Sequence, residues 1–584
     1  MKQYFEKMPS TFGKKLEDNQ IKQMQENFEQ IKAEEKKLAE AVKTAKKAGI
    51  PEETLHKRGE KTVYERIELL VDHNPDGSST FLPLDTLYNP SNTNEEGTAG
   101  VVNGLGKVEG RYCSIIASDN KVLAGAWIPN QAEKIFRGQD IADRLNIPLV
   151  WVLNCSGVKL TQQEEVYAGR RGHGRPFFRH AELIQKGIPV LVAVFGTNPA
   201  GGGYHAISPA MIFAHKNANM AVGGAGIVSG MSPKGGFDLE GAEQIIEATR
   251  KFKQTPPGGA ATHYDHTGFF KKVFDTEEEV INALRECIKM MPAYDPEFFR
   301  FATPKPPLYT PAEIDYIMPF NQKRSYDVEQ IMARIFDNSE HTEYRPGYGP
   351  EVYCGLAKLD GFLVGVIANR QGFLPKGYPK YAPYPGVGGK LYREGLIKMN
   401  ELVTSCGRDR IPMIWLQDTS GIDVGDIAEK AELLGIGQAL IYSIQQSDLP
   451  MATVVLRKGT AAAHYILGGP QATSNNAFTL GTPTTEIYVM HGETAAAASF
   501  SRRLVKEKDA GKPLEPVIDA MNKLAKQYYD QSRPVYCAQR GYVDEVVSFA
   551  QLRDYFMIFA RACYQNPKSF CPQHQMILPR SIRG

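Results

Sequence analysis

The chain has 584 residues, too many for one hydrophobic core, and its 42% hydrophobic and 23% charged residues are an ordinary globular composition. Its net charge of +2 gives no electrostatic reason to expect binding to nucleic acid or to an anionic membrane. No apolar run approaches the roughly 20 residues that span a bilayer, and residues 1–14 lack the apolar core of a signal peptide. We therefore expect a cytoplasmic protein with two large domains.

The first predicted element is a charged amphipathic helix over residues 15–49, within an N-terminal helical arm over residues 1–55. Its apolar residues recur at steps of three, four and seven, and Gly49 and Pro51 end it. These residues are Ile21, Met24, Phe28, Ile31, Leu38, Val42 and Ala45. We expect the arm to pack on its own domain or on a second subunit; a regulatory or recruitment role is the alternative.

Short apolar runs that alternate with helical stretches follow the arm. Such alternation predicts an α/β architecture with partly parallel sheets. We expect a first domain over residues 56–303 and a Pro-rich linker over residues 304–325. A second domain is expected over residues 326–584, with an extra Gly/Pro/Tyr-rich segment at 372–389 that is either a surface connection or part of a pocket wall.

The second domain repeats the first. Gly-Leu-Gly-Lys-Val-Glu-Gly at 104–110 returns as Gly-Leu-Ala-Lys-Leu-Asp-Gly at 355–361, and the stretch from Ile147 to Val158 returns from Ile411 to Ile422. The matches keep their order and extend over most of a domain. The sequence therefore predicts a duplicated fold, not a short repeat array.

Each copy carries two loops of small residues that directly follow apolar runs. Residues 154–158 and 196–204 form this pair in the first copy, and residues 418–422 and 459–465 form it in the second. Glycine lets backbone N–H groups face a ligand, and two neighbouring loops can direct two donors at one oxygen, which is an oxyanion hole. The alternative is that the small residues only let a helix begin close to a sheet.

Other chemistries have weak or no signals in the sequence. A phosphate loop, a dinucleotide fingerprint after the first strand and a Gly-x-Ser-x-Gly elbow are all missing. The eight cysteines form no Cys-x-x-Cys pair and no cluster with zinc spacing, so we expect reduced thiols and no metal. Cys155 has no base indicated by spacing, and His464 is expected to position or pack rather than to act as an acid–base catalyst.

Cations near these loops could bind the phosphates of a ligand such as coenzyme A. The stretch from 170 to 179, rich in Gly and Arg, is the best candidate; for each cation taken singly, surface solvation is the alternative. The cations are Lys159, Arg170, Arg171, Arg175, Arg179, Arg457 and Lys458.

Several motifs together resemble the biotin-dependent carboxyltransferases of the crotonase superfamily. They are the Arg-Gly-Glu opening at 58–60, Pro-Ala-Gly-Gly at 199–202 followed by Ser208-Pro209, and the tail at 571–580. The chain departs from the acyl-CoA carboxylase branch at three places, with Cys-Ser-Gly-Val-Lys at 155–159, Asp-Thr-Ser-Gly at 418–421 and Thr-Ala-Ala-Ala at 460–463. These departures resemble the sodium-pumping decarboxylase branch.

The resemblance implies two tandem crotonase-like domains, each a β-β-α spiral, in a homodimer with shared active sites. Carried over by motif, Val158 and Gly202 match the donors for the acyl-CoA thioester oxygen, and Gly421 with Ala461 or Ala462 matches the donors for the biotin ureido oxygen. The remaining implied site residues are Gly157, Gly201, Arg170, Arg171 and Arg175 for the acyl-CoA and Ser420, Gly459 and Thr460 for biotin.

The activity that the resemblance implies is transfer of the carboxyl group of glutaconyl-CoA to biotin, which leaves crotonyl-CoA. The chain contains neither the Ala-Met-Lys-Met attachment sequence nor an ATP-binding signature. We therefore expect biotin to arrive on a carrier subunit, and the resemblance implies a membrane-embedded decarboxylase that pumps sodium as a further partner, with this chain peripheral to the membrane. The alternatives are a carboxyltransferase beta subunit of an acyl-CoA carboxylase (propionyl-, acetyl- or methylcrotonyl-CoA) and a noncatalytic scaffold.

Overall fold

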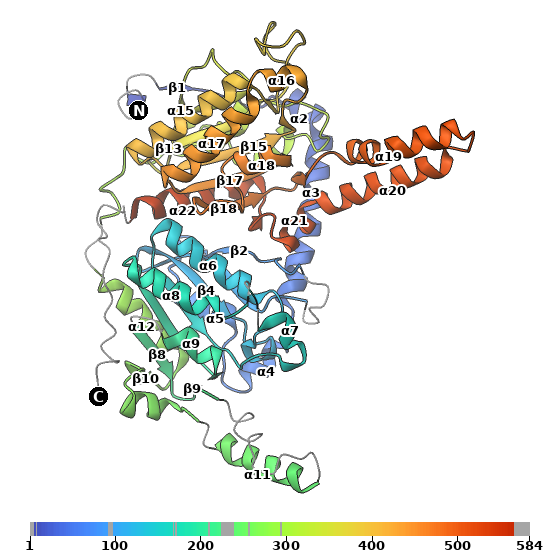
Figure 1. Cartoon of the computed structure of the whole chain (residues 1–584). Coiled ribbons are helices and arrows are strands. Elements are labelled where there is room, and N and C mark those ends of the chain that lie inside the picture. Colours follow the sequence, from blue (N-terminus) through green and yellow to red (C-terminus); the bar gives the residue numbers. More distant parts are fainter. Residues whose placement is uncertain are drawn as a thin grey trace. The chain divides into compact units, whose positions relative to one another are not determined.

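The computed structural model describes residues 5–6, 9–90, 97–167, 169, 172–207, 211–223, 239–254, 257–291 and 295–565. It divides the chain into two compact units (Figure 1). Unit 1 comprises residues 1–42 and 296–564, and unit 2 comprises residues 43–295 and 565–584. The stretch expected to form an arm therefore contributes to both units, and residues 304–325 belong to unit 1.

The predicted N-terminal helix is confirmed as two helices, α2 (Asp18–Gln23) and α3 (Gln25–Lys46). Ile31 and Leu38 of the expected apolar face are buried, and Phe28 stacks on Tyr316 with ring centroids 4.6 Å apart. The arm thus packs on its own chain, as one of the two expectations had it. The elements that follow before the first large sheet are α4 (Glu52–His56) and α5 (Val63–Leu70), which begins with a capping box of Thr62 and Glu65.

Unit 2 is built on a seven-stranded sheet with the order β10-β8-β6-β5-β4-β3-β2. The strands from β2 to β4 pair antiparallel, and those from β4 to β10 pair parallel. The strands are β2 (Leu82–Leu84), β3 (Val101–Val108), β4 (Arg111–Ser118), β5 (Leu149–Leu153), β6 (Val190–Val194), β8 (Met211–His215) and β10 (Lys272–Phe274). Because β5 and β6 are apolar at every residue, both faces of the sheet are covered by helices.

The two faces of this sheet carry different helices. On one face Ile135 and Leu183 pack with Trp151, and on the other Ile67 and Leu284 lie in the core cluster. The covering helices are α6 (Gln131–Leu145) and α8 (Arg175–Gln185) on the first face and α5 and α12 (Glu277–Lys289) on the second. The smaller elements are η1 (Leu123–Gly125), η2 (Leu160–Gln162), α7 (Gln163–Val166), β7 (Thr197–Pro199), α9 (Gly201–Ile207), β9 (Asn219–Ala221), α11 (Leu239–Gln254) and η3 (Thr262–His266).

Unit 1 repeats this plan in a nine-stranded sheet with the order β1-β11-β12-β13-β15-β17-β18-β20, with β19 paired to β17. An antiparallel hairpin is again followed by parallel strands. The strands are β1 (Ser10–Thr11), β11 (Glu340–Glu343), β12 (Val352–Leu359), β13 (Phe362–Asn369), β15 (Met413–Thr419), β17 (Met451–Thr460), β18 (Asn476–Gly481), β19 (Glu486–Tyr488) and β20 (Glu545–Val546). β14 (Lys390–Leu391) and β16 (Gly421–Ile422) form a separate pair.

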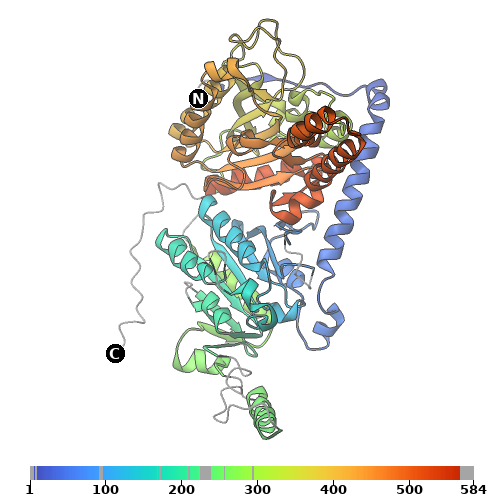
Figure 2. The same ribbon diagram turned by 45° about the vertical axis from the view of Figure 1, so that its right-hand side comes forward.

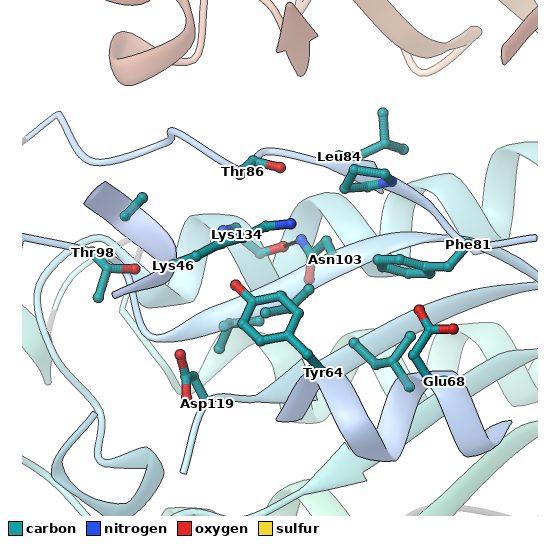
Figure 3. A pocket seen from close by; sticks show the side chains of 15 residues that line it. Lys46, Tyr64, Glu68, Phe81, Leu84, Thr86, Thr98, Asn103, Asp119 and Lys134 are labelled. Carbon is teal, nitrogen blue, oxygen red and sulfur yellow. Dashed lines mark hydrogen bonds between the residues drawn. The ribbon is translucent and has the colours of Figure 1, made fainter. Parts of the chain in front are cut away.

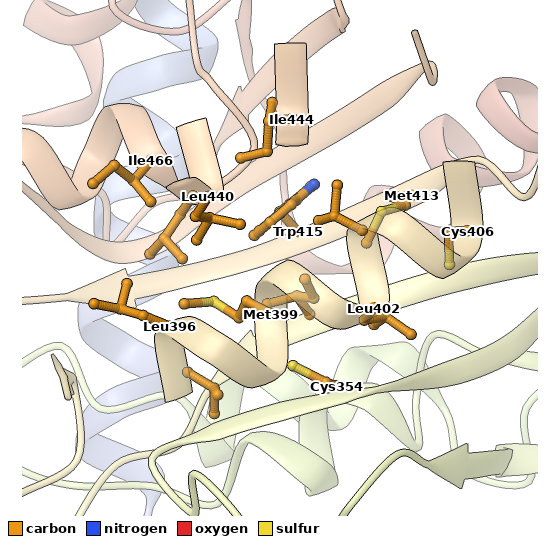
Figure 4. Packing of buried hydrophobic residues seen from close by; sticks show 14 of the residues in the cluster. Cys354, Leu396, Met399, Leu402, Cys406, Met413, Trp415, Leu440, Ile444 and Ile466 are labelled. Atoms are coloured by element: carbon orange, nitrogen blue, oxygen red, sulfur yellow. The ribbon is translucent and has the colours of Figure 1, made fainter. Parts of the chain in front are cut away.

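The helices of unit 1 follow the same scheme. Trp415 of β15 packs with Met399 and Leu402 of α15 (Arg393–Asp409) and with Leu440 and Ile444 of α17 (Leu433–Ser447) in one buried cluster (Figure 4). The other helical elements are η4 (Pro311–Glu313), α13 (Ile314–Ile317), α14 (Val328–Met332), η5 (Asp337–Ser339), α16 (Asp426–Lys430), α18 (Ala461–Ile466), α21 (Pro534–Arg540), η6 (Phe549–Gln551) and α22 (Leu552–Gln565). The strand order and helix placement confirm the predicted duplication.

Unit 1 also carries an antiparallel helical hairpin, α19 (Gly492–Asp509) and α20 (Glu515–Ser532), which lies beside the end of β19. The two helices lie side by side in both views (Figures 1 and 2). None of the helices that the structure describes is both long enough and apolar enough to cross a membrane.

Candidate active site

In unit 2, the two loops predicted to form the first site lie against each other at the carboxyl ends of β5 and β6. The Cys155 N–H donates to Oδ1 of Asn198 at 2.8 Å. The Asn198 amide in turn donates to the carbonyls of Phe195 at 2.8 Å and Asn219 at 3.2 Å. Asn198 is fully buried, so this side chain joins residues 154–158 to residues 196–204. The predicted juxtaposition of the two loops is therefore present.

The orientation of the Val158 peptide is set by Trp127. The Trp127 N–H donates to the Gly157 carbonyl at 2.7 Å, and the Lys159 N–H donates to the Trp127 carbonyl at 2.9 Å. This pattern pairs Trp127 with Val158 as in a parallel ladder, so the Val158 N–H points away from Trp127. No acceptor for the Val158 N–H is found in the part of the chain that the structure describes.

Gly202 supplies a second N–H beside this loop. It lies in the first turn of α9, where backbone N–H groups lack intrahelical partners, and no other acceptor is present among the described residues. A Cβ on Gly202 would lie 2.8 Å from the Cys155 carbonyl oxygen and 3.0 Å from its Sγ. Glycine is therefore required for the close approach that places the Gly202 donor next to the Val158 loop.

The corresponding loop of unit 1 is held by β14. The Ser420 N–H donates to the Gly389 carbonyl at 2.7 Å, and the Asp423 N–H donates to the Leu391 carbonyl at 3.0 Å. Leu391 pairs with Ile422, just as Trp127 pairs with Val158. The Gly421 N–H, which the motif carry-over assigned as a donor, points to Oγ1 of its neighbour Thr419 at 3.1 Å. The geometry therefore favours Ile422 over Gly421 as the counterpart of Val158.

The Ala-rich loop of unit 1 can be aligned with the loop before α9 in unit 2. Ala461 has φ of +50°, as Ala200 has φ of +48° before α9. Four residues later, Tyr465 is 57% exposed and its counterpart Tyr204 is 49% exposed. This register places the buried Ala463 where Gly202 stands, and Ala462 where Gly201 stands. Ala463 was not among the predicted donors. The predicted Gly459 and Thr460 are the last two residues of β17, directly before the three alanines.

Ile422 and Ala463 stand where Val158 and Gly202 stand in the other copy, and one signal in the sequence pointed to the first of them. The repeat itself aligns Ser156-Gly157-Val158 with Ser420-Gly421-Ile422, which pairs Val158 with Ile422. The register of the Ala-rich loop had no such signal, because its three consecutive alanines cannot be distinguished by sequence.

A buried ion pair joins the two loops of unit 1. Asp418, at the end of β15, accepts from Nε of Arg457 at 2.8 Å and from the Lys458 backbone N–H at 3.2 Å. Burial raises the pKa of Asp418, but the charges of Arg457 and Lys458 outweigh it and hold the pKa below its usual value. Arg457 is buried in this pair, which removes it from the cations available to a phosphate.

Comparison with known proteins identifies the family. A family described as "Carboxyl transferase domain" matches residues 54–577. The chain belongs to the carboxyl transferase family. It is 54% identical over 586 aligned positions to "Glutaconyl-CoA decarboxylase subunit alpha" of Acidaminococcus fermentans, with 100% of this chain and 98% of that protein covered. The predicted resemblance to biotin-dependent carboxyltransferases is confirmed.

This carboxyl transferase family member also resembles more distant proteins. It is 27% identical to the "Biotin-dependent 3-methylcrotonyl-coenzyme A carboxylase beta1 subunit" of Mycobacterium tuberculosis, covering 87% of this chain and 90% of that protein. The crystal structure of the geranyl-CoA carboxylase beta subunit of P. aeruginosa superposes with a TM-score of 0.76 at 22% identity, covering 98% and 100% of the two chains. This likeness, with the repeated strand order, confirms the α/β fold of two tandem crotonase-like domains.

The cations predicted near the carboxyltransferase loops differ in what they contact. Arg179 is neutralised by Asp140, Asp143 and Glu182 at 2.6 to 2.9 Å. Arg175, at the start of α8, is exposed, with its guanidinium 5.1 Å from the centre of the Phe136 ring. Arg170 and Arg171 lie outside the described residues. Among the predicted phosphate ligands that the structure describes, Arg175 is exposed and Lys159 is half-buried.

Two side chains that could have acted as catalysts are held neutral by burial. Burial raises the pKa of the Cys155 thiol to about 12, so a thiolate nucleophile is not favoured. Burial lowers the pKa of His464 to about 4, and its Nδ1 lies 2.9 Å from Oε1 of Gln417. The Gln417 amide donates to the His464 carbonyl at 3.2 Å, which makes Oε1 the acceptor of the pair. His464 therefore holds α18 on β15.

Each unit contains a cavity, and the one in unit 1 is lined by predicted residues. In unit 2, a cavity of about 180 Å³ is lined by Lys46, Tyr64, Asn103, Asp119 and Lys134 (Figure 3), which adds two lysines to the cations of this unit. In unit 1, a cavity of about 360 Å³ is lined by the predicted Gly459 and Ala461, by His464 and by four tyrosines: Tyr465, Tyr488, Tyr528 and Tyr542. Among the described residues, no group of three or more His, Cys, Asp and Glu side chains could hold a metal ion.

Acid should destabilise unit 2 through a buried histidine. His180 is buried against Trp151 with neither ring nitrogen hydrogen-bonded, and burial lowers its pKa to about 3. Because this pKa lies below the unfolded value of about 6.5, the unfolded chain takes up the proton first, and stability falls as pH drops below about 6.5. We expect the melting temperature of His180→Phe to fall less between pH 7 and pH 5 than that of the wild type. The control is His266→Phe, because His266 is exposed. An equal change of melting temperature with pH in the wild type and both variants would contradict the prediction.

Proposed function

We propose that the chain is the carboxyltransferase subunit of a glutaconyl-CoA decarboxylase, which transfers the carboxyl group of glutaconyl-CoA to biotin and leaves crotonyl-CoA. The observation that carries the proposal is the pair of unengaged donors in unit 2, Val158 and Gly202; a related pair of loops recurs in unit 1. The 54% identity to the Acidaminococcus fermentans subunit over the whole chain supports glutaconyl-CoA as the substrate.

The chemistry explains why the thioester side needs two backbone donors. Loss of the carboxyl group leaves a dienolate whose negative charge is shared with the thioester oxygen. The N–H groups of Val158 and Gly202 stabilise that charge, and their peptides are already oriented by Trp127 and Asn198. No side-chain nucleophile takes part, in agreement with the neutral thiol of Cys155.

The loops of unit 1 fit the ureido group of biotin, since its oxygen requires hydrogen-bond donors. We propose the N–H groups of Ile422 and Ala463 as these donors, with Ser420, Gly459, Thr460, Ala461 and Ala462 around them and Gly421 shaping the turn. When bound, biotin supplies the nitrogen that accepts the carboxyl group. The donors then stabilise the charge on its ureido oxygen, and holding both reactants together supplies proximity.

We also propose the finer assembly. Residues 56–303 form the acyl-CoA side, residues 326–584 form the biotin side, and two chains form a homodimer with shared sites. Biotin arrives on a carrier subunit, because the chain contains no Ala-Met-Lys-Met sequence. A membrane-embedded decarboxylase that pumps sodium completes the complex, and this chain is a cytoplasmic subunit at the membrane.

The test is carboxyl transfer by the purified chain with glutaconyl-CoA and free biotin, without ATP. Formation of crotonyl-CoA that depends on biotin supports the proposal. The second candidate, an acyl-CoA carboxylase beta subunit, is favoured by the 27% identity to the 3-methylcrotonyl enzyme. Carboxylation of 3-methylcrotonyl-CoA or propionyl-CoA with ATP and a biotin carboxylase, without reaction of glutaconyl-CoA, would replace the first function by the second. If neither assay showed turnover, a noncatalytic scaffold would be the remaining function.

The extra segment at 372–389 should affect the biotin side. The hydroxyls of Tyr381 and Tyr384 donate to Oδ2 of Asp423, the residue after Ile422, and Nζ of Lys390 lies 3.2 Å from Oδ1 of Asp423. We expect the double change Tyr381→Phe and Tyr384→Phe to raise KM for biotin about tenfold, since both tyrosine hydrogen bonds from the segment to Asp423 are lost. KM for glutaconyl-CoA is the internal control, and an equal rise in both constants would contradict the prediction.

A further inference from the structure

A buried aromatic cluster lies directly behind the thioester-side loops of unit 2. Trp127 stacks on His173 with ring centroids 4.2 Å apart and planes 16° apart. His205 of α9 meets the edge of Trp127 at 5.2 Å and lies 4.5 Å from Trp151 of β5. Trp127 is 4% exposed and Trp151 is 1% exposed, so the two indoles are equally well buried in one cluster.

We propose that Trp127 is the positioning residue that sets the spacing of the two oxyanion donors, Val158 and Gly202. The inference rests on the proposed function, because it concerns the donors that stabilise the dienolate. Trp127 touches neither reacting atom in this role and acts through the two loops. Trp127 contacts both loops, one with its backbone and the other with its ring.

The backbone contact fixes the first donor. The bonds from the Trp127 N–H to the Gly157 carbonyl at 2.7 Å and from the Lys159 N–H to the Trp127 carbonyl at 2.9 Å enclose the Val158 peptide from both sides. Rotation of that peptide would break at least one of them. The Val158 N–H is thereby kept pointing away from Trp127.

The indole contact fixes the second donor. A Cβ built on Gly201 would lie 1.9 Å from Cη2 and 2.4 Å from Cζ2 of Trp127, so the far edge of the ring lies directly against the Gly201 backbone. Gly201 immediately precedes Gly202 at the start of α9. The indole is therefore a spacer between the Val158 strand and the first turn of α9, and no smaller side chain would maintain that separation.

The ring of Trp127 is itself held in place. Nδ1 of His173 lies 3.0 Å from the Val166 carbonyl, and its Nε2 lies 3.2 Å from Oε1 of Gln131. The Gln131 amide donates to the Ala126 carbonyl at 3.0 Å, next to Trp127 in the chain. A hydrogen bond from the Nδ1–H of the neutral imidazole to the Val166 carbonyl holds the ring that stacks on the indole, and this ring keeps the indole from tilting.

For catalysis, the positions of the two donors must be held to within fractions of an ångström. Oxyanion donors act only within hydrogen-bonding distance of the developing charge, and catalytic groups must be held to within about 0.5 Å. Loss of the spacer should therefore reduce the rate of the chemical step and leave binding of the acyl-CoA, which rests on other contacts, nearly unchanged.

The experiment compares Trp127→Phe with Trp151→Phe in the full-length protein, after wild-type turnover of glutaconyl-CoA with biotin has been established. We expect Trp127→Phe to lower kcat about 10- to 100-fold with KM for glutaconyl-CoA within about twofold of wild type. Trp151→Phe should lower the melting temperature similarly with kcat within about twofold. Equal kcat losses in the two variants would overturn the inference. Absence of wild-type turnover would instead refute the proposed function.

A pair of compensating changes tests the spacer directly and does not depend on the stability of Trp127→Phe. Gly201→Ala alone should lower kcat at least about 100-fold, because its methyl group collides with the indole. In the double variant Trp127→Leu with Gly201→Ala, the space of the missing ring accepts the methyl group. We expect the double variant to exceed Gly201→Ala in kcat by about tenfold. A double variant no more active than Gly201→Ala would overturn the inference.

Discussion

Replacing Gly202 with alanine is expected to lower the rate of carboxyl transfer from glutaconyl-CoA about 100- to 1000-fold, the usual effect of losing one oxyanion donor. The physical reason is the lack of space at this position. The added Cβ would meet the Cys155 carbonyl oxygen at 2.8 Å and the Cys155 side chain at 3.0 Å. The first turn of α9 must move to relieve this contact, and the Gly202 N–H moves with it.

The matched control is Gly174→Ala, the residue before α8 in the same unit. Gly174 has φ of −72°, and no heavy atom lies within 4 Å of the Cβ that alanine would add. We expect this variant to keep its rate and its melting temperature. Steady-state kinetics with glutaconyl-CoA and free biotin measure both variants, and a Gly202→Ala enzyme with kcat within threefold of wild type would exclude Gly202 as a donor.

Replacing Asp418 with alanine is expected to destabilise unit 1 by about 3–5 kcal/mol, because it leaves the buried Arg457 without its counter-ion. The Arg457 guanidinium then keeps neutral partners: the carbonyls of Arg324 at 2.7 Å and Asn321 at 3.4 Å, Oε1 of Gln371 at 3.5 Å and the face of Tyr326. Asp418 also accepts from the Lys458 N–H, so its loss releases both loops of the proposed biotin side. Carboxyl transfer should therefore fall together with stability.

The pH dependence of this loss follows from the pKa of Asp418, which lies below its unfolded value of about 3.9. The stabilisation is fully present above that unfolded value and is lost only as pH falls through the lower folded value. The loss of melting temperature in Asp418→Ala should therefore be the same at pH 6 and at pH 9. A loss that varied over this range would show that another titrating group is involved.

Glu277→Ala is the control for Asp418→Ala. Glu277 forms a buried bidentate pair with Arg66 in unit 2, at 2.8 Å from Nε and 2.6 Å from Nη2, away from the predicted donors. We expect a comparable loss in thermal unfolding with little change in kcat at temperatures where the protein stays folded. Equal activity of the Asp418 and Glu277 variants would contradict the role of Asp418 in supporting the biotin-side loops.

The thioester-side loops could be predicted from the sequence because they require glycine. Gly157 has φ of +103° and Gly202 sits against a carbonyl, and both features exclude a side chain. The repeat then located a second pair of loops. The Ala-rich loop carried less information, since alanine tolerates many backbone conformations. The positive φ of Ala461 became visible only in the folded chain and moved the expected donor to Ala463.

Local sequence patterns could not predict the contacts between segments that are distant in the chain. Asn198, Trp127 and Asp418 contact loops that are distant in the chain, and their sequence neighbours give no sign of it. The hydroxyls of Tyr381 and Tyr384 in the 372–389 segment reach Asp423 in the same way, a contact that the composition of the segment did not predict.

The sequence by itself determined the α/β class, the duplication, the order of the elements and the four small-residue loops. It could do so because hydrophobic periodicity and the steric freedom of glycine are local properties of the chain. Only the tertiary structure decided which peptide in each loop points its N–H outward and which buried side chains hold it there. These depend on strand register and on packing between segments, where a shift of one residue turns a donor from the site to the opposite side of the strand.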